Sequence, residues 1–240
     1  MIREQSIKEQ DKLITVLTRS DGLIRAFIHG AKSIKSPKST ASGLLTYSRF
    51  SIYKGRDSYI IDECYAQEVF MPLRKDVEKL ALAQYFCELA GELAPEGENA
   101  EEQLRLTLNS LHFLCQGSKS LSLIKSTFEL RMLTLAGYMP NLVCCDSCGC
   151  YEHEDMRFLP QKGLIVCGDC CGKYSDAQIR IGLGVTRAMR HCVYSEFSKL
   201  FAYSLKENSQ PILETAAEEY LKMQISKTFQ TLEFYKMLKN

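Results

Sequence analysis

The sequence predicts an α+β protein of several domains, in which an N-terminal β domain precedes a helical domain with an inserted four-cysteine zinc finger. Three observations support this: β-branched and aromatic runs up to residue 70, apolar residues at helical spacing from residue 77 onward, and two Cys-x-x-Cys pairs within the helical region. The predicted domains are 1–72 (β), 73–142 (helical, first part), 143–175 (zinc finger) and 176–240 (helical, C-terminal part).

Four N-terminal runs have the composition of short β-strands, at residues 13–18, 23–29, 44–54 and 58–70. Turn residues separate them, such as Asp21-Gly22. Because successive side chains of a strand point to opposite faces, Ile24, Ala26 and Ile28 share one apolar face. Short strands at this spacing predict a small barrel or sandwich.

The β domain is strongly basic although the whole chain has a net charge of only +1. From Lys12 to Arg56 there are nine basic residues and one acidic residue, Asp21, which indicates a surface that binds a polyanion. Cations that neutralise phosphates and rings that stack on bases are typical of single-strand binding, although rings in strands also serve as core. The candidate nucleic-acid-binding residues are Arg19, Arg25, His29, Lys32, Lys35, Lys38, Arg49, Lys54, Phe27, Tyr47 and Tyr53.

Residues 30–43 carry three lysines among small residues. This composition predicts a flexible loop that wraps on a phosphate backbone, or otherwise a solvated loop without a ligand.

Apolar residues recur at helical spacing in the second half of the chain. We expect this helical domain, and not the barrel, to receive an acidic apolar peptide from a partner, with Arg131 as a candidate contact to a carboxylate. The apolar positions that predict the five helices run from Val77 to Leu89, Leu104 to Cys115, Leu121 to Leu135, Met189 to Leu200 and Leu213 to Leu221.

The cysteine pairs Cys145/Cys148 and Cys167/Cys170 are eighteen residues apart, a spacing that suits one tetrahedral zinc ion. Four thiolates leave no open coordination position, so the predicted zinc is structural. A thioredoxin-like redox pair, or a redox sensor that uses all the crowded cysteines, is the alternative. Three further cysteines nearby are bystanders or substitute ligands, namely Cys144, Cys150 and Cys171.

The sequence contains none of the motifs of common catalytic sites. It lacks a phosphate-binding loop, a zinc-protease helix and a dinucleotide fingerprint, so we expect a protein that is not an enzyme and has no small-molecule substrate. No apolar run is long enough for a membrane span, no signal peptide is evident, and eleven cysteines suit a reducing compartment, so we expect a cytoplasmic protein that does not bind membranes.

The order of these parts resembles the bacterial RecO family of DNA repair proteins. The resemblance covers nearly the whole chain. It rests on Gly30-Ala31-Lys32, Leu44-Leu45, Phe128-Glu129-Leu130-Arg131, Gly137-Tyr138-x-Pro140, Cys145-x-x-Cys148-Gly149, Phe158 and Gly163-Leu164-x-x-Cys167-x-x-Cys170.

The resemblance implies an OB-fold that binds single- and double-stranded DNA, and a protein that anneals complementary strands without an active site. It also implies contacts with RecR and with the C-terminal tail of single-strand binding protein, RecA loading, and association with the nucleoid. This chain begins at Met1-Ile2-Arg3, where the family usually has further residues that complete a first strand, so we expect either that the start is misplaced or that the barrel edge is open and less stable. A zinc-ribbon scaffold that binds RNA or a transcription partner, without annealing, is the competing interpretation.

Overall fold

The computed structural model describes residues 1–7, 10–33, 36–56 and 58–239. Contacts divide the chain into two compact units, Met1–Gly117 with Phe229–Asn240, and Ser118–Thr228. Each unit is described by itself. The four domain boundaries predicted from the sequence remain a proposal.

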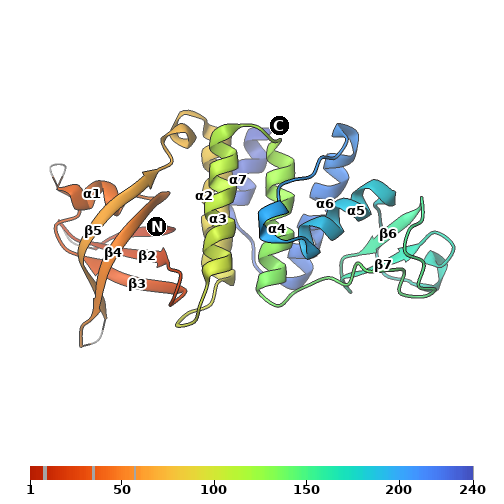
Figure 1. Ribbon diagram of the computed structural model, residues 1–240, viewed down its shortest axis with the longest axis horizontal. Coiled ribbons are helices and arrows are strands. Elements are labelled where there is room, and N and C mark those ends of the chain that lie inside the picture. The colour runs from red at the N-terminus through yellow and green to blue at the C-terminus, as the bar shows by residue number, and fades with distance from the viewer. Residues whose placement is uncertain (8–9, 34–35, 57, 240) are drawn as a thin grey trace. The chain divides into compact units, whose positions relative to one another are not determined.

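The first unit contains a five-stranded sheet in the order β1-β2-β3-β5-β4, in which only the β3–β5 pair is parallel. A short helix, α1 (Pro37–Ala41), lies between β3 and β4 in the chain and covers one end of the sheet (Figure 1). This is the partly open Greek-key barrel of an OB-fold, which confirms the predicted fold class. The strands are β1 (Arg3–Ser6), β2 (Lys12–Leu17), β3 (Leu23–Ile28), β4 (Thr46–Lys54) and β5 (Tyr59–Val69).

Two backbone contacts tie the start of the chain to the start of β4. The Met1 amino group donates to the carbonyl oxygen of Thr46 over 2.8 Å, and the Leu45 N–H donates to the carbonyl of Met1 over 3.2 Å. Beyond them, no strand in the described ranges pairs with the outer edge of β4. A first strand is therefore present, and the barrel is closed only where Met1 meets the start of β4.

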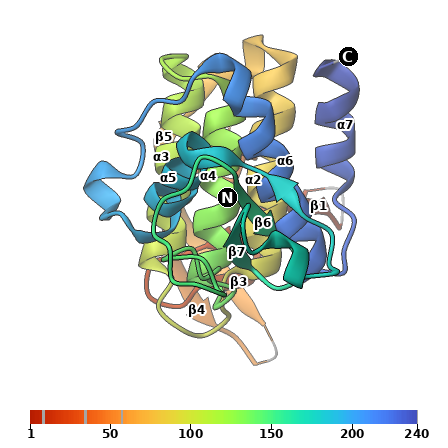
Figure 2. The same ribbon diagram turned by 90° about the vertical axis from the view of Figure 1, so that its right-hand side faces the viewer.

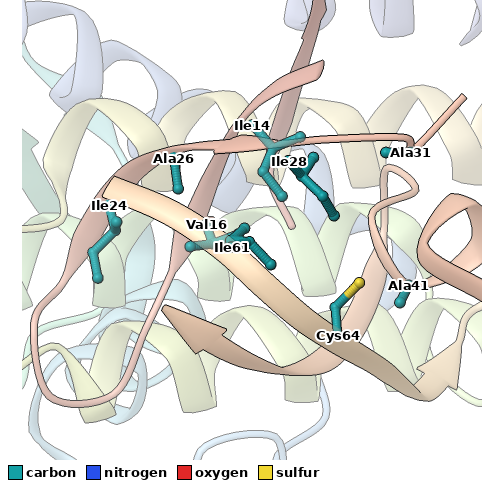
Figure 3. Close-up of a cluster of buried hydrophobic side chains, with 9 residues drawn as sticks. All are labelled: Ile14, Val16, Ile24, Ala26, Ile28, Ala31, Ala41, Ile61 and Cys64. Carbon is teal, nitrogen blue, oxygen red and sulfur yellow. The ribbon is translucent and has the colours of Figure 1, made fainter. Parts of the chain in front are cut away.

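The barrel core confirms the predicted alternation along β3. Ile24, Ala26 and Ile28 are buried, whereas Arg25 between them is exposed. Ile14 from β2 and Ile61 from β5 complete the same buried cluster, drawn in Figure 3. The opposite face of these strands is consequently free to carry polar and aromatic side chains.

The basic segment after β3 is more ordered than its composition predicts. Ser36 accepts a hydrogen bond from the Lys38 N–H and caps α1, with Pro37 in its first turn. Ser-Pro is a helix-start signal that the prediction of a flexible loop overlooked. Lys35 lies outside the described residues.

Three helices of the first unit pack together, with α2 against both α3 and α7. Helix α7 has no counterpart among the predicted helices. At its start Phe229 meets Tyr85 edge to face, with ring centroids 5.8 Å apart, which fixes α7 on α2. The elements are 3₁₀ turn η1 (Met71–Lys75), α2 (Val77–Leu93), α3 (Glu101–Gln116) and α7 (Gln230–Lys239).

The β2–β3 turn docks against the segment that joins α2 and α3. The Leu23 N–H donates to the Pro95 carbonyl over 2.8 Å, and the Gly97 N–H donates to the Asp21 carbonyl over 2.9 Å. Gly22 between them has φ +60°, and a Cβ added there would overlap the Pro95 carbonyl. Glycine is therefore required at this position both for its backbone conformation and for close approach.

Replacing Gly22 with alanine is expected to lower the free energy of unfolding by more than about 1 kcal/mol, because the strain of a left-handed residue adds to a steric overlap. Gly30→Ala is the matched control, since Gly30 has φ +68° but no atom within 4 Å of an added Cβ. Urea unfolding measures both variants. Equal losses would show that the contact with Pro95 contributes nothing beyond backbone strain.

The second unit is a helical body with a small cysteine-rich sheet. Helix α4 packs against α5 and α6, and its residues from Leu123 to Leu133 are all buried. The helix predicted to reach Leu200 ends at Tyr194, because Ser195 is extended and a separate 3₁₀ turn follows. The elements, teal to blue in Figure 2 apart from the green α4, are α4 (Leu121–Leu135), β6 (Met156–Leu159), β7 (Leu164–Cys167), η2 (Cys171–Lys173), β8 (Ile179–Arg180), α5 (Gly182–Tyr194), η3 (Phe197–Lys199), η4 (Glu207–Ser209) and α6 (Gln210–Gln224).

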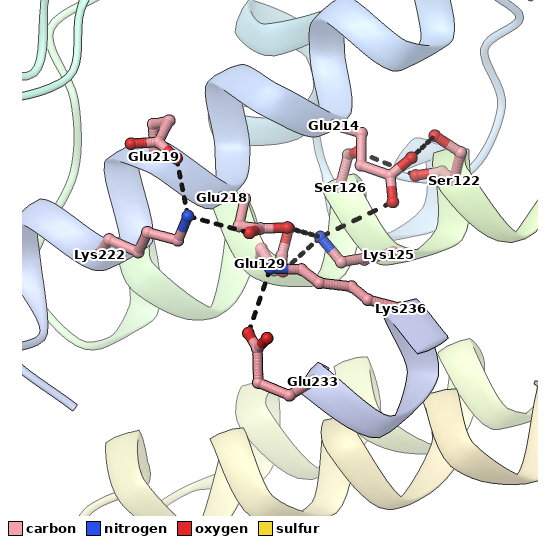
Figure 4. A network of polar contacts seen from close by, with 10 residues as sticks. All are labelled: Ser122, Lys125, Ser126, Glu129, Glu214, Glu218, Glu219, Lys222, Glu233 and Lys236. Atoms are coloured by element: carbon pink, nitrogen blue, oxygen red, sulfur yellow. Dashed lines mark hydrogen bonds and ion pairs between the residues drawn. The ribbon is translucent and has the colours of Figure 1, made fainter. Parts of the chain in front are cut away.

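A buried ion cluster joins α4 to α6 (Figure 4). The Lys125 ammonium and the Glu129 carboxylate are fully buried, 2.9 Å apart. Glu218 and Glu214 on α6 approach the same ammonium to 3.3 and 3.9 Å. Burial opposes the charged form of Lys125, but these three carboxylates outweigh it and raise its pKa. One cation therefore holds three carboxylates at the centre of the helical body.

None of the helices in the described ranges combines the length and apolar character needed to cross a membrane.

Candidate metal centre and nucleic-acid interface

Four cysteine sulfurs of the second unit converge on one point. The Sγ atoms of Cys145, Cys148, Cys167 and Cys170 all lie within 4.8 Å of one another, and Cys148 and Cys167 are 3.7 Å apart. Four ionised thiols this close repel one another unless a cation lies between them. The arrangement therefore fits a four-thiolate metal centre, as the two Cys-x-x-Cys pairs predict.

Backbone N–H groups of the tight turns around the cysteine pairs point at the sulfur of Cys145. The Cys167 N–H donates to Cys145 Sγ over 3.3 Å, and Gly149 with φ +72° lets the chain fold back after Cys148. Burial opposes ionisation of Cys145, but hydrogen bonds from the N–H groups of Cys167, Cys148 and Ser147 lower its pKa to about 6. A thiol that ionises readily is prepared to bind a metal.

The neighbouring cysteines are not part of this cluster. Cys150 Sγ is directed at the carbonyl oxygen of Glu152, 3.1 Å away, and Cys171 Sγ at that of Gly168, 2.9 Å away. Cys144, the third of them, does not belong to the group of converging sulfurs found in the described residues. The geometry thus selects the four cysteines predicted as ligands.

The outer face of the barrel carries a row of apolar and aromatic side chains. Register places Leu13 of β2 beside Phe27 of β3, Phe27 beside Ile60 of β5, and Ile60 beside Tyr53 of β4. Leu13, Phe27 and Ile60 are half-buried, whereas Tyr53 is 52% exposed. Phe27 lies in the middle of a surface that crosses four strands.

A hollow of about 390 Å³ opens beside Phe27, between β3 and the β4–β5 turn. The described residues that line it include three cations and no carboxylate. None of the three is in an ion pair within the described chain. Leu13, Phe27 and Tyr59 give the hollow its apolar part; Arg25, Lys54 and Arg56 supply the positive charge, and Ser58 completes it.

Phe27 also lines a second hollow, of about 250 Å³. It is lined by Asp11 and His29, whose Oδ2 and Nδ1 atoms are 3.1 Å apart, and by Ile7 and Ile60. Phe27 and Ser58 line both hollows. Phe27 therefore belongs to the lining of both a basic hollow and one that contains a carboxylate.

Two candidate residues face a different part of the first unit. Arg19 and Tyr47 line a cavity of about 630 Å³ between the barrel and α3. Arg19 also pairs with Glu101, Nε to Oε1 3.6 Å. Alternation along residues 44–54 predicts Tyr47 on the outer face together with Tyr53; in the structure Tyr47 is instead half-buried beside this cavity, next to a register shift in the β4–β5 pairing. Lys54 lines both this cavity and the basic hollow.

The remaining candidates do not line either hollow. Lys32 follows β3, Lys38 lies on α1, and Arg49 is exposed on β4 opposite Tyr65. Arg131 of α4 is only 7% exposed and donates to the Ser195 carbonyl over 2.5 Å. Its guanidinium is engaged inside the helical unit, so the predicted contact to a partner would require this bond to open.

Four residues that line the basic hollow are not among the candidates predicted from the sequence, namely Leu13, Arg56, Ser58 and Tyr59. For two of them the sequence does contain a pattern that indicates their position. Leu13 occupies the position opposite Phe27 in a hairpin around Asp21-Gly22, and Arg56 lies in the turn Gly55-Arg56-Asp57 between two strands. The parallel β3–β5 pairing that brings the turn to β3 is not visible in the sequence.

Comparison with known families matches both parts of the chain. The model of "Recombination protein O N terminal" matches residues 1–70, and that of "Recombination protein O C terminal" matches residues 74–233.

Curated proteins similar to this chain bear one name, "DNA repair protein RecO". The protein from Acetivibrio thermocellus is 31% identical over 99% of this chain and 94% of its own length. That from Symbiobacterium thermophilum is 26% identical over 100% of this chain and 96% of its own length. That from Desulforudis audaxviator is 35% identical over 71% of this chain and 68% of its own length.

Proposed function

We propose that this chain, which belongs to the RecO family of DNA repair proteins, is a recombination mediator that binds single- and double-stranded DNA and anneals complementary strands. Family membership supports the role in DNA repair and recombination. We also propose two finer steps. Together with RecR, the protein loads RecA onto DNA that is coated by single-strand binding protein. Its helical unit receives the C-terminal tail of single-strand binding protein. We place the protein in the cytoplasm at the nucleoid and assign it no catalytic step.

The observation that carries the proposal is the basic hollow beside Phe27. OB-folds bind oligonucleotides on the face of their second and third strands and on the adjoining loops. Here that face presents Arg25, and the β4–β5 turn adds Lys54 and Arg56. Phosphate contacts of this kind hold a strand in place without reading its sequence, which leaves most bases available for pairing.

The four converging thiols support one structural zinc ion. Thiolate sulfur in a closed tetrahedral set is the donor set that zinc prefers, and such an ion would stabilise the segment around β6 and β7. Zinc bound there supplies folding energy and no reaction.

Annealing of complementary strands, each coated with single-strand binding protein, tests the function. The protein is expected to accelerate duplex formation without nucleotide, and Arg25→Ala combined with Arg56→Ala is expected to slow it. Each lost phosphate contact should also reduce the slope of log affinity against log salt for a single strand by about 0.7. Fluorescence energy transfer between labelled strands reports annealing, and anisotropy reports affinity.

Lys199→Ala combined with Lys206→Ala removes the same charge from exposed positions of the second unit that line neither hollow. Equal slopes in the two double variants would remove the barrel hollow from DNA binding. Tighter binding of a matched RNA, without any annealing, would favour an RNA scaffold and contradict the recombination function.

A further inference from the structure

The basic hollow differs from a simple charged patch because an aromatic side chain forms one of its walls. In the register Phe27 lies between Leu13 and Ile60, so an apolar residue flanks it on each neighbouring strand. A ring flanked in this way loses little conformational freedom when a ligand stacks on it.

The size and chemistry of the hollow suit one nucleotide. Its volume, about 390 Å³, lies at the lower end of the usual range of small-molecule sites, about 300–1,000 Å³. The rings of Phe27 and Tyr59 offer faces for a base, while Arg25, Lys54 and Arg56 offer charge for its phosphate. Aromatic and cationic groups in one concave site are the combination that single-stranded nucleic acids select.

The second hollow sets the direction of the ligand. Asp11 lies there, where it accepts a hydrogen bond from the Gly30 N–H over 3.3 Å and pairs with His29, so a phosphate is less favoured in this hollow than in the basic one. The backbone of a strand is therefore expected over the basic hollow, with its base turned toward the ring.

We infer that the Phe27 hollow is a nucleobase subsite that takes one unstacked base and thereby gives the barrel a preference for unpaired DNA. The inference rests on the proposed function and deepens it. A base inside a duplex must be unstacked before it can enter such a hollow, at a cost of a few kcal/mol, whereas a single strand offers its bases freely. Pairing with a second strand withdraws the base, so duplex formation weakens the hold of the protein on its product.

An oligothymidylate and an abasic strand of the same length separate base contacts from phosphate contacts. The wild-type protein is expected to bind the thymidylate more tightly than the abasic strand. Phe27→Ala should weaken thymidylate binding by about tenfold or more, the effect of one stacked base, and leave abasic binding unchanged. Phe27→Tyr keeps the ring and should retain the preference. Fluorescence anisotropy measures the affinity of each protein for each strand.

Tyr65→Ala is the matched control, since Tyr65 is 60% exposed on the same sheet and lines neither hollow. Phe27→Leu keeps an apolar side chain without a stacking face, so it gives the result for the base even where the alanine variant folds poorly. Equal losses on both strands would overturn the base subsite alone. Failure of the wild-type protein to bind either strand would overturn the proposed function as well.

Discussion

Replacing Cys167 with serine is expected to reduce bound zinc from about one ion per chain to almost none and to unfold the segment around β6 and β7. Cys167 is buried and is one of four converging sulfurs, so no solvent molecule replaces it easily. A structural zinc site contributes about 10–16 kcal/mol, as much as the total stability of a typical domain, about 5–15 kcal/mol. Elemental analysis by mass spectrometry measures the metal, and limited proteolysis measures the local unfolding.

Cys171→Ser is the matched control, because Cys171 is four residues further along and its sulfur is directed at the Gly168 carbonyl, not into the cluster. It should retain both the metal and the protease resistance. Zinc retained by Cys167→Ser but lost by Cys171→Ser would reassign the ligand set. Loss of zinc from the wild-type protein in mild oxidant, with disulfide formation, would instead favour a redox sensor.

The residues of the four-cysteine cluster and of the barrel core could be predicted because short-range patterns determine them. Cys-x-x-Cys spacing brings two sulfurs onto one turn, and alternation along β3 separates Ala26 from Arg25. The basic hollow could be predicted only in part. Phe27 and Lys54 are candidates from composition, but their proximity depends on the parallel β3–β5 pair and on the β4–β5 register with its shifts, which are long-range features.

Prediction from the sequence is limited in the helical body as well. The stripe Ile124, Phe128 and Met132 predicts an amphipathic α4 with Lys125 and Glu129 on its polar side. In the structure that polar side is also buried, because α6 covers it with Glu214 and Glu218. Periodicity identifies the apolar side of a helix, but it does not reveal that a neighbouring helix supplies charged partners to the other side.

Replacing Lys125 with methionine is expected to destabilise the protein by about 3–5 kcal/mol at neutral pH, because it removes the fully buried cation that three carboxylates approach in the helical body. The lost stability should return in part as the pH falls, since a buried carboxylate that loses a neighbouring cation is protonated more readily. In the wild-type protein the raised pKa of Lys125 keeps its ammonium charged up to and beyond the ordinary lysine pKa of about 10.4, so deprotonation of Lys125 lowers stability only in alkali. Chemical unfolding of the wild-type protein and the variant at pH 5 and pH 8 measures the destabilisation and its partial recovery at lower pH.

Lys222→Met serves as the control, because Lys222 pairs with Glu218 and Glu219 but its side chain is 48% exposed. Solvent screens such a pair, so its loss should cost less than about 1 kcal/mol and depend little on pH. Adding Glu129→Met to Lys125→Met removes the fully buried carboxylate and should recover much of the stability, because an apolar pair replaces an ion pair at the same place. If Lys125→Met is no worse than Lys222→Met, water must reach the cluster, and the charges would then contribute little to the packing of α4 on α6.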